Sequence, residues 1–307
     1  MSEMSQPLFS VVIPCYNYAH TVGRAIESVL AQDGDDFEII VVNDGSTDDS
    51  EPVIKYYSSR HPNLVRYEYQ DNSGPAATRN RGIQLSKGRY LIFLDADDEM
   101  VDGALSRVRD HLDEEGDVDL LIGGHISASD KGDEKIHHVK RLPHEPEQRF
   151  LAYLNKKISI SNGATLMHRR IFNAIKYCED LRNVEDIPVF AQVLALYDCR
   201  VIDTPIAKIC KHSDSLRYDT NIARDVGLRV VDVLFDKKIL PSELFKYRRM
   251  YYAKRCLSLF RIFYLGGERE AARHYYCTAL KTDPRALLKW SYFKKYIRFV
   301  FRSYFSH

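Results

Sequence analysis

Three aspartates crowd the end of one apolar run. Residues 90–94 (YLIFL) read as a buried strand, and Asp95, Asp97 and Asp98 follow directly. Carboxylates this close repel one another unless a positive group neutralises them. In an extended chain Asp95 and Asp97 point the same way and offer the hard oxygen ligands that Mg2+ or Mn2+ prefers. Such an ion eases the departure of a diphosphate. An acidic loop capping the helix expected near Val101 is the alternative.

The elements that must position these aspartates alternate regularly over the first hundred residues. Apolar, β-branched runs alternate with segments of helical spacing, which predicts crossover connections and a largely parallel sheet with helices on both faces. Ligands bind beyond the carboxyl ends of such strands, so polar segments 14–17, 43–46 and 95–98 should share one rim. We expect strands at 9–13, 38–42, 65–69 and 90–94, and helices at 22–30, 52–58 and 76–85.

The pattern loosens after Val101. Residues 125–140 look like two strands joined by a Gly-containing turn, and an Asn-Gly turn precedes an apolar stretch within 159–172. From about Asn221 to the end the sequence is strongly helical and aromatic. Further elements are expected at 103–115 (helix), 119–123 (strand) and 187–197 (helix).

Composition excludes several classes of protein. Lys and Arg total 44 against 43 Asp and Glu, so a net charge of +1 gives no general attraction to nucleic acid. Six cysteines without a CxxC pair predict reduced thiols and a cytoplasmic location. The acidic N-terminal segment is unlike a signal peptide, and no apolar run is long enough to span a bilayer.

Five segments, in this order, resemble the signatures of family 2 glycosyltransferases. They are SVVIPCYN, VVNDGSTDDS, NSGPAATRNRGI, LIFLDADD and NVEDIPVF, and the resemblance covers roughly residues 8–215. It implies an α/β protein of GT-A type, with a Rossmann-like, mostly parallel sheet flanked by helices. Residues 1–100 would form the nucleotide-sugar-binding half, 101–220 the acceptor-binding and catalytic-base half, and 221–307 a helical C-terminal extension.

The resemblance also implies an activity. It is the inverting, metal-dependent transfer of a hexose-class sugar from a UDP- or dTDP-sugar to a glycan or glycolipid acceptor, in assembly of lipopolysaccharide or another surface polysaccharide. A nucleotide-sugar-binding or scaffold protein without turnover is the alternative. The sequence identifies neither the donor sugar nor the acceptor.

The donor-site residues follow from the same resemblance. Asp44 would accept a hydrogen bond from the pyrimidine ring N–H, which uracil and thymine both offer; a turn at 43–45 is the alternative. Arg79 would complete the nucleotide pocket or, alternatively, pair with the acidic cluster. The other implied contacts are Pro14, Tyr16, Asn17, Gly74, Asn80, Asp95 and Ala96 to the nucleotide, Asn162 and Gly163 to the donor sugar, and Asp97, Asp95 and His212 to the divalent cation.

The catalytic base should be a carboxylate that takes the proton from the attacking hydroxyl. Glu185 and Asp186 match the Glu-Asp pair of the family, whose aspartate implies the base; Glu185 is the second candidate or an acceptor contact. Because an aspartate with an ordinary pKa near 4 is a weak base, orientation must supply much of the effect. An acidic pair that stabilises the start of the next helix is compatible with this role.

Residues 286–307 combine basic and apolar residues and contain no Asp or Glu. At helical spacing these residues make a basic amphipathic helix, which suits the anionic inner face of a cell membrane. Packing on the catalytic domain, or on a second copy in a homodimer, is the alternative. The basic members are Lys289, Lys294, Lys295, Arg298 and Arg302, and the apolar members are Trp290, Phe293, Ile297, Val300, Phe301 and Tyr304.

Other chemistries fit less well. A phosphatase that uses an aspartyl-phosphate would carry its nucleophile after the first strand, which here ends in PCYN. A nucleotidyltransferase would need an early Gly-rich basic loop, which is missing. Cys15 has no sequence cue for a partner base and is expected to be buried.

Overall fold

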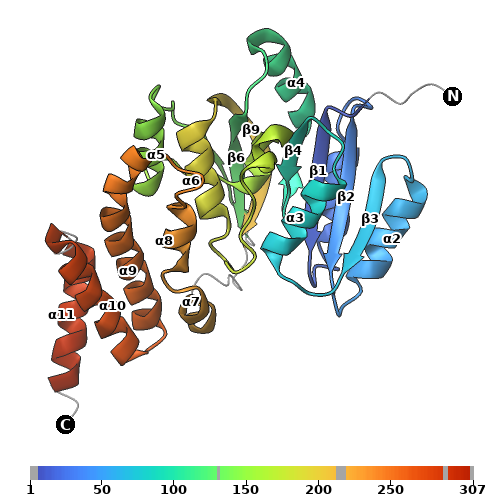
Figure 1. Ribbon diagram of the computed structural model, residues 1–307. Helices are drawn as coiled ribbons and strands as arrows, with labels where there is room; N and C mark the ends of the chain where they lie inside the picture. Colours follow the sequence, from blue (N-terminus) through green and yellow to red (C-terminus); the bar gives the residue numbers. More distant parts are fainter. Residues whose placement is uncertain (1–5, 130–131, 212–218, 286–289, 305–307) are drawn as a thin grey trace. The chain divides into compact units, whose positions relative to one another are not determined.

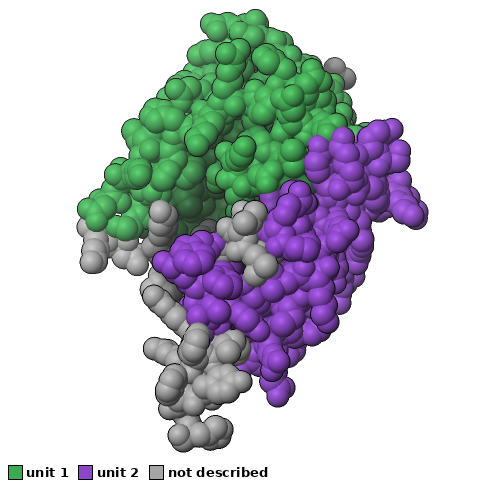
Figure 2. Space-filling model, turned by 90° about the vertical axis from the view of Figure 1, so that its left-hand side faces the viewer, with its two compact units in different colours: residues 1–179, 189–214 green, residues 180–188, 215–307 purple. Residues whose placement is uncertain are grey.

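The computed structural model describes residues 6–129, 132–211, 219–285 and 290–304, with the side chains of the last helix as far as Ile297. The chain divides into two compact units (Figures 1 and 2). Unit 1 comprises residues 1–179 and 189–214, and unit 2 comprises 180–188 and 215–307. Each unit is described by itself.

Unit 1 is built on a nine-stranded mixed sheet with strand order β3-β2-β1-β4-β8-β6-β9-β5, and β7 pairs with β6 outside this path. Strands β3, β2, β1 and β4 can be followed in Figure 1. The first four strands run parallel to one another, whereas β8 is antiparallel to both β4 and β6. The strands are β1 (Phe9–Cys15), β2 (Phe37–Asp44), β3 (Val65–Gln70), β4 (Tyr90–Phe93), β5 (Glu99–Met100), β6 (Leu120–Ser129), β7 (Glu134–His137), β8 (Thr165–His168) and β9 (Cys199–Lys211).

Helices cover both faces of the β1–β4 region. Val11 and Ile13 of β1 share a fully buried core with α1, whereas Val12, between them, faces α3. Gly82 of α3 lies so close to the sheet that an added Cβ would overlap Val12 Cγ1. The helices are α1 (Val22–Leu30), α2 (Ser50–Arg60), α3 (Pro75–Leu85), α4 (Ala104–Glu115) and α5 (Pro146–Leu154), the short η1 (Asn162–Ala164) and η2 (Arg169–Asn173), and α6 (Asp186–Leu196), whose first residues belong to unit 2.

Unit 2 is helical and rich in aromatic residues. Its core lies between α9 and α10, where Phe260, Phe263 and Tyr276 are almost fully buried. Phe263 stacks on Tyr275 with ring centroids 5.4 Å apart. The helices are α7 (Thr220–Val226), α8 (Arg229–Leu234), the short η4 (Ser242–Tyr247), α9 (Arg248–Leu265), α10 (Arg269–Thr282) and α11 (Trp290–Tyr304).

The predicted fold class is confirmed: the sheet is mostly parallel, helices flank it, and the C-terminal region is helical. The strands and helices expected up to residue 115 are present, most of them extended by one or a few residues. The first of the two strands expected within 125–140 is a continuation of β6. Strand β9 was not predicted, because Asp203, Pro205 and Lys208 interrupt its apolar pattern.

Candidate donor-binding site

The loops that follow β1 and β2 are tied together at the carboxyl ends of the strands. Asn17 adopts a left-handed backbone with φ 60°, and its N–H donates to Ser46 Oγ at 3.0 Å. In return, Thr47 N–H donates to Asn17 Oδ1 at 2.7 Å, and Ser46 N–H donates to Asn43 Oδ1 at 3.0 Å. Asn tolerates this conformation better than most residues, which gives Asn17 a structural reason to be there. The rim is therefore held in shape by the protein itself.

Two tyrosines at this rim differ in what they offer. The Tyr16 ring is 45% exposed, so it presents an aromatic face on which a base could stack. The Tyr18 hydroxyl donates to Asp97, and burial together with the neighbouring aspartates raises the pKa of Tyr18 to about 12. Tyr18 was not predicted as a site residue, although it directly follows the PCYN segment. It links the first loop to the acidic cluster.

Asp44, at the end of β2, is only 3% exposed and already accepts three hydrogen bonds. Its Oδ1 accepts from Gln70 Nε2 at 2.7 Å and from Ser73 N–H at 2.9 Å, and its Oδ2 accepts from Gly74 N–H at 2.9 Å. A carboxylate has about four lone-pair sites, so one acceptor position is left for a ligand N–H. Asp44 therefore positions the loop before α3 and retains one acceptor position.

Arg79 on α3 adopts the alternative that the sequence left open. It is 5% exposed, and its Nη2 donates to Asp95 Oδ1 at 2.9 Å. Its guanidinium also lies 5.6 Å from the centre of the Tyr177 ring. Because the Asp95 side chain is 42% exposed, it can contact a ligand while its hydrogen bond to Arg79 fixes its position. Arg79 thus fixes the position of the Asp95 carboxylate.

Asn80, the next residue, is used within the protein. Its Nδ2 donates to the Tyr177 carbonyl and to Glu179 Oε1, both at 2.9 Å, and its Oδ1 accepts from Tyr177 N–H at 3.2 Å. Both amide hydrogens are therefore engaged. The Asn80 side chain therefore fixes segment 177–179, and it has no N–H left to donate to a nucleotide.

The acidic cluster follows β4 as a tight turn, with Asp98 N–H donating to the Asp95 carbonyl at 3.0 Å. Asp98 is 5% exposed and accepts from Cys210 N–H at 2.9 Å. Burial, followed by the charges of Asp95 and Asp97, raises the pKa of Asp98 to about 9. The side chain of Ala96 is buried, so only its backbone can reach a ligand. Asp98, which had no predicted role, anchors the turn to β9.

The acidic cluster offers part of a coordination shell for a divalent cation. Within the described ranges, no three His, Cys, Asp or Glu side chains are arranged to hold a metal ion. Mg2+ is commonly held by one or two carboxylates together with substrate phosphates, and Asp95 and Asp97 can supply that part of a coordination shell. Burial is the larger cause of the raised Asp98 pKa; the charges of Asp95 and Asp97 add to it, and a cation bound to these two carboxylates would offset their mutual repulsion. His212, the third predicted ligand, lies outside the described residues.

The residues predicted to face the donor sugar lie in η1, beside the ends of β4 and β9. Gly163 is buried, and an added Cβ there would lie 3.4 Å from Leu94 Cδ1 and 3.3 Å from Ala207 Cβ. Asn162 Oδ1 is buried without a hydrogen-bond partner among the described residues. It can therefore accept a hydrogen bond from a ligand hydroxyl.

The predicted catalytic pair stands at the start of α6, in the segment assigned to unit 2. Glu185 is 6% exposed, whereas Asp186 is half-buried. Asp186 lies near Tyr251 of α9, where burial, with a contribution from the Asp186 charge, raises the pKa of the Tyr251 hydroxyl to about 12. Of the two carboxylates, Asp186 is the more accessible to an acceptor.

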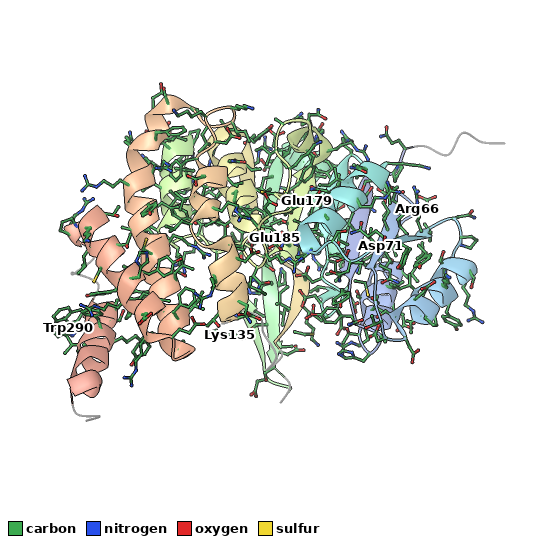
Figure 3. All side chains as sticks on the ribbon, turned by 60° about the horizontal axis from the view of Figure 1, so that its bottom comes forward. Arg66, Asp71, Lys135, Glu179, Glu185 and Trp290 are labelled. Carbon is green, nitrogen blue, oxygen red and sulfur yellow. The ribbon has the colours of Figure 1, made fainter. Side chains whose placement is uncertain are left out.

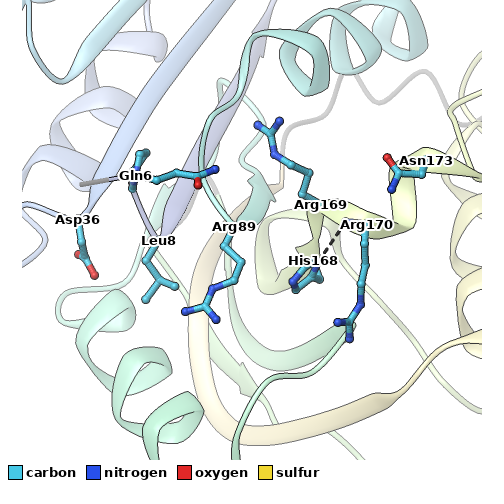
Figure 4. A pocket seen from close by; sticks show the side chains of 9 residues that line it. Gln6, Leu8, Asp36, Arg89, His168, Arg169, Arg170 and Asn173 are labelled. Atoms are coloured by element: carbon cyan, nitrogen blue, oxygen red, sulfur yellow. Dashed lines mark hydrogen bonds between the residues drawn. The ribbon is translucent and has the colours of Figure 1, made fainter. Parts of the chain in front are cut away.

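A cavity of about 610 Å3 lies elsewhere in unit 1, at the amino ends of β1 and β4 (Figure 4). Arg89 pairs with Asp117 at 3.0 Å, and Arg170 pairs with Asp119, while Arg169 points away from both arginines. Two of these arginines thus serve internal ion pairs, and the cavity is remote from the carboxyl ends of the strands. Its lining consists of Gln6, Pro7, Leu8, Asp36, Arg89, His168, Arg169, Arg170 and Asn173.

This chain is similar to a known family, to curated proteins and to solved structures. The family model described as "Glycosyl transferase family 2" matches residues 10–176. An uncharacterized glycosyltransferase, YibD of Escherichia coli (strain K12), is 45% identical over 91 residues, which are 30% of this chain and 26% of the relative. From Bacillus subtilis (strain 168), the uncharacterized glycosyltransferase EpsJ is 29% identical over 59% of this chain and 54% of its own. The minor teichoic acid biosynthesis protein GgaB is 30% identical over 50% of this chain and 19% of its own.

The chain thus spans at most about half the length of these relatives. Similar solved structures include S. aureus TarS 1–349 in complex with UDP-GlcNAc, with a TM-score of 0.59 and 17% identity over 91% of this chain and 92% of that one. The complex of the same protein with UDP has a TM-score of 0.58 and 18% identity, over 91% of each chain. At this level of identity the likeness establishes a shared fold.

Proposed function

Because this chain belongs to glycosyl transferase family 2, we propose that it transfers a sugar from a UDP- or dTDP-sugar to an acceptor hydroxyl, with inversion at the anomeric carbon. The observation that carries this proposal is the rim at the carboxyl ends of β1, β2 and β4. There Asp44, which has one acceptor position left, lies on the same sheet edge as the half-buried pair Asp95 and Asp97. A base at one end and a diphosphate at the other are the ligand parts that these groups complement.

In the proposed complex the pyrimidine ring N–H donates to the remaining acceptor site of Asp44, and the base stacks on Tyr16. Arg79 holds Asp95 toward the ribose and diphosphate. Two similar structures are complexes of S. aureus TarS with UDP and with UDP-GlcNAc, which supports a uridine donor here. Asn162 Oδ1 accepts from a hydroxyl of the donor sugar.

A Mg2+ or Mn2+ ion, held by Asp97 and Asp95, would neutralise the charge that develops on the departing diphosphate. Two neighbouring side chains would keep these carboxylates in position: Tyr18 fixes Asp97, and Arg79 fixes Asp95. Asp98 holds the turn in place by accepting from Cys210 N–H. His212 is the further proposed ligand.

Asp186 is the proposed general base. As the first residue of α6 it stands on a rigid helix terminus, and it is more exposed than Glu185. It takes the proton of the acceptor hydroxyl while the oxygen attacks the anomeric carbon and the bond to the diphosphate breaks. The acceptor hydroxyl becomes more acidic as it attacks, so orientation compensates for a weak base.

The proposed acceptor is a glycan or glycolipid of the cell surface. Two B. subtilis relatives, GgaA and GgaB, carry the name minor teichoic acid biosynthesis protein, which supports surface-polymer assembly as the setting. Teichoic acid is thus as good an expectation as lipopolysaccharide.

The test compares Asp186→Asn with wild type. We expect turnover of UDP-GlcNAc, or of another UDP- or dTDP-sugar, to fall by roughly 100-fold or more, the usual effect of losing a general base. Thermal stabilisation by UDP with Mn2+ should be unchanged, because binding does not need the base. The exposed Asp180, also in unit 2, provides the matched control: Asp180→Asn should stay within twofold of wild type.

Unchanged turnover in Asp186→Asn would remove Asp186 from the base role. Stabilisation of the wild type by UDP without turnover of any donor would favour a binding protein instead. Equal stabilisation by UDP with chelator present would count against the metal site.

A further inference from the structure

Helix α11 has two aromatic faces, and only one of them packs on the rest of unit 2. Tyr296 stacks on Tyr276 of α10 with centroids 4.0 Å apart. Tyr292 and Tyr296 also approach Phe260 of α9, at 6.2 and 6.4 Å. Since Tyr292 and Tyr296 are four residues apart, they share one helix face. This tyrosine face packs against the buried core of α9 and α10. The contact does not involve Trp290, Phe293 or Ile297, the other apolar residues of the described part of the helix.

A second apolar stripe lies on another side of the helix. Trp290 and Phe293 stack with centroids 5.4 Å apart, and Ile297 continues the same stripe one turn later. The Trp290 side chain points away from α9 and α10 (Figure 3). It is 60% exposed, more than any other large apolar side chain in the described part of the chain. A tryptophan in water at this level forgoes much of the free energy that its burial would supply.

One lysine flanks this stripe, and a second lies on the tyrosine side of the helix. Lys294 Nζ lies 5.3 Å from the centre of the Trp290 ring, whereas Lys295 Nζ lies 5.8 Å from the centre of the Tyr292 ring. Residues 286–307 contain five Lys and Arg and no Asp or Glu. An apolar stripe with an exposed tryptophan, a cation beside it and no acid in its own segment is complementary to an apolar layer beneath an anionic one.

The dimensions of the helix decide how it could meet such a layer. Its 15 residues measure about 22 Å, short of the roughly 30 Å hydrocarbon core of a bilayer. Among the described helices none is long and apolar enough to cross a membrane. The helix can therefore lie only in the plane of an interface, where a tryptophan ring is most favourably placed.

We propose that α11 docks unit 2 on an anionic bilayer, with Trp290, Phe293 and Ile297 entering the headgroup region while Lys294 contacts an acidic lipid headgroup. The Tyr292–Tyr296 face keeps the helix attached to α9 and α10 during docking. The two alternatives raised by the sequence, packing and membrane contact, are thus met by different faces of one helix. This docking does not depend on the proposed transferase activity.

The test is flotation of the full chain with vesicles of phosphatidylcholine alone and of phosphatidylcholine with 30% phosphatidylglycerol, an illustrative composition at roughly physiological salt. The wild type should float with the anionic vesicles and remain behind with the neutral ones. Trp290→Ser with Phe293→Ser should lower the bound fraction at least tenfold. Leu265→Ser is the matched control, since Leu265 is a 53% exposed apolar residue at the end of α9, and it should bind like wild type.

The charge contribution is tested separately. Lys294→Gln should weaken partitioning about fivefold, because a lysine near an anionic surface accounts for about a fivefold factor. Lys237→Gln removes the same charge from an exposed site in the same unit and should change partitioning much less. Thermal melting of each variant verifies that unit 2 stays folded.

Two results would overturn the proposal. One is equal binding of the wild type and the Trp290/Phe293 variant to anionic vesicles. The other is sedimentation of the wild type as a dimer that the same variant dissociates, without any vesicle binding, which would assign the stripe to a second copy of the chain.

Discussion

Replacing Asp44 by Asn tests whether this carboxylate holds the loop before α3. The substitution keeps the size of the side chain but removes its charge and turns one acceptor oxygen into an NH2 donor. In the structure both oxygens accept: Oδ1 from Gln70 and Ser73, and Oδ2 from Gly74. An asparagine can satisfy the first two donors only with its single oxygen, so its NH2 group must face the Gly74 N–H.

The magnitude follows from these contacts. One charge-assisted hydrogen bond is lost, a buried donor at Gly74 is left unpaired, and the other two hydrogen bonds weaken without the charge. An unpaired buried donor costs about 1–3 kcal/mol, so we expect Asp44→Asn to lower the free energy of unfolding by about 2–4 kcal/mol. For a unit of this size that corresponds to roughly 4–16 °C in Tm.

The assay is thermal unfolding of the ligand-free protein, followed by circular dichroism. Asp49→Asn is the control: Asp49 is an exposed residue at the start of α2 whose side chain makes no capping hydrogen bond, and the change should stay within about 0.5 kcal/mol. UDP should also bind less tightly to Asp44→Asn, because its pocket includes the displaced loop.

A ligand-free Tm within 1 °C of the wild type, together with lost UDP binding, would refute this reasoning. Asp44 would then act on the base alone, and its contacts to Ser73 and Gly74 would contribute nothing to stability.

Two further predictions follow from packing and burial. Gly82→Ala should destabilise the protein by about 1–3 kcal/mol despite the better helix propensity of Ala, because the added Cβ would overlap Val12. In a urea titration, the double variant with Val12→Ala should regain part of the lost free energy of unfolding. Additive losses in the double variant would contradict the packing argument. Burial raises the pKa of the Cys15 thiol to about 11, so iodoacetamide at pH 8 should label the half-buried Cys178 of the folded protein but not Cys15. Labelling of Cys15 should rise only as the pH approaches 11 or in denaturant. Equal labelling of both thiols in the folded state would show that Cys15 is accessible.

The strands and helices of the first hundred residues could be predicted because each is indicated by the residue pattern of its own segment. Buried parallel strands need short apolar runs, and the helices between them need apolar residues at 3.6-residue spacing, so each element is encoded within its own segment. Parallel connection then places the segments after β1, β2 and β4 on one rim. Strand β9 could not be predicted in this way, because its polar residues and its proline are accommodated by pairing with β6, which is distant in the sequence.

The sequence by itself determined the order of the strands and helices up to residue 115, the family, and the position of Asp44, Asp95 and Asp97 at strand ends. Only the tertiary structure decided which atoms these side chains contact: Asp44 holds Ser73 and Gly74, Arg79 holds Asp95, and Asn80 clasps Tyr177. It also decided that α11 docks by its tyrosine face and leaves Trp290 outside. The physical reason is that periodicity fixes which face of an element is apolar, whereas a hydrogen-bond partner or a packing partner depends on which distant segment the fold brings within about 3 to 4 Å.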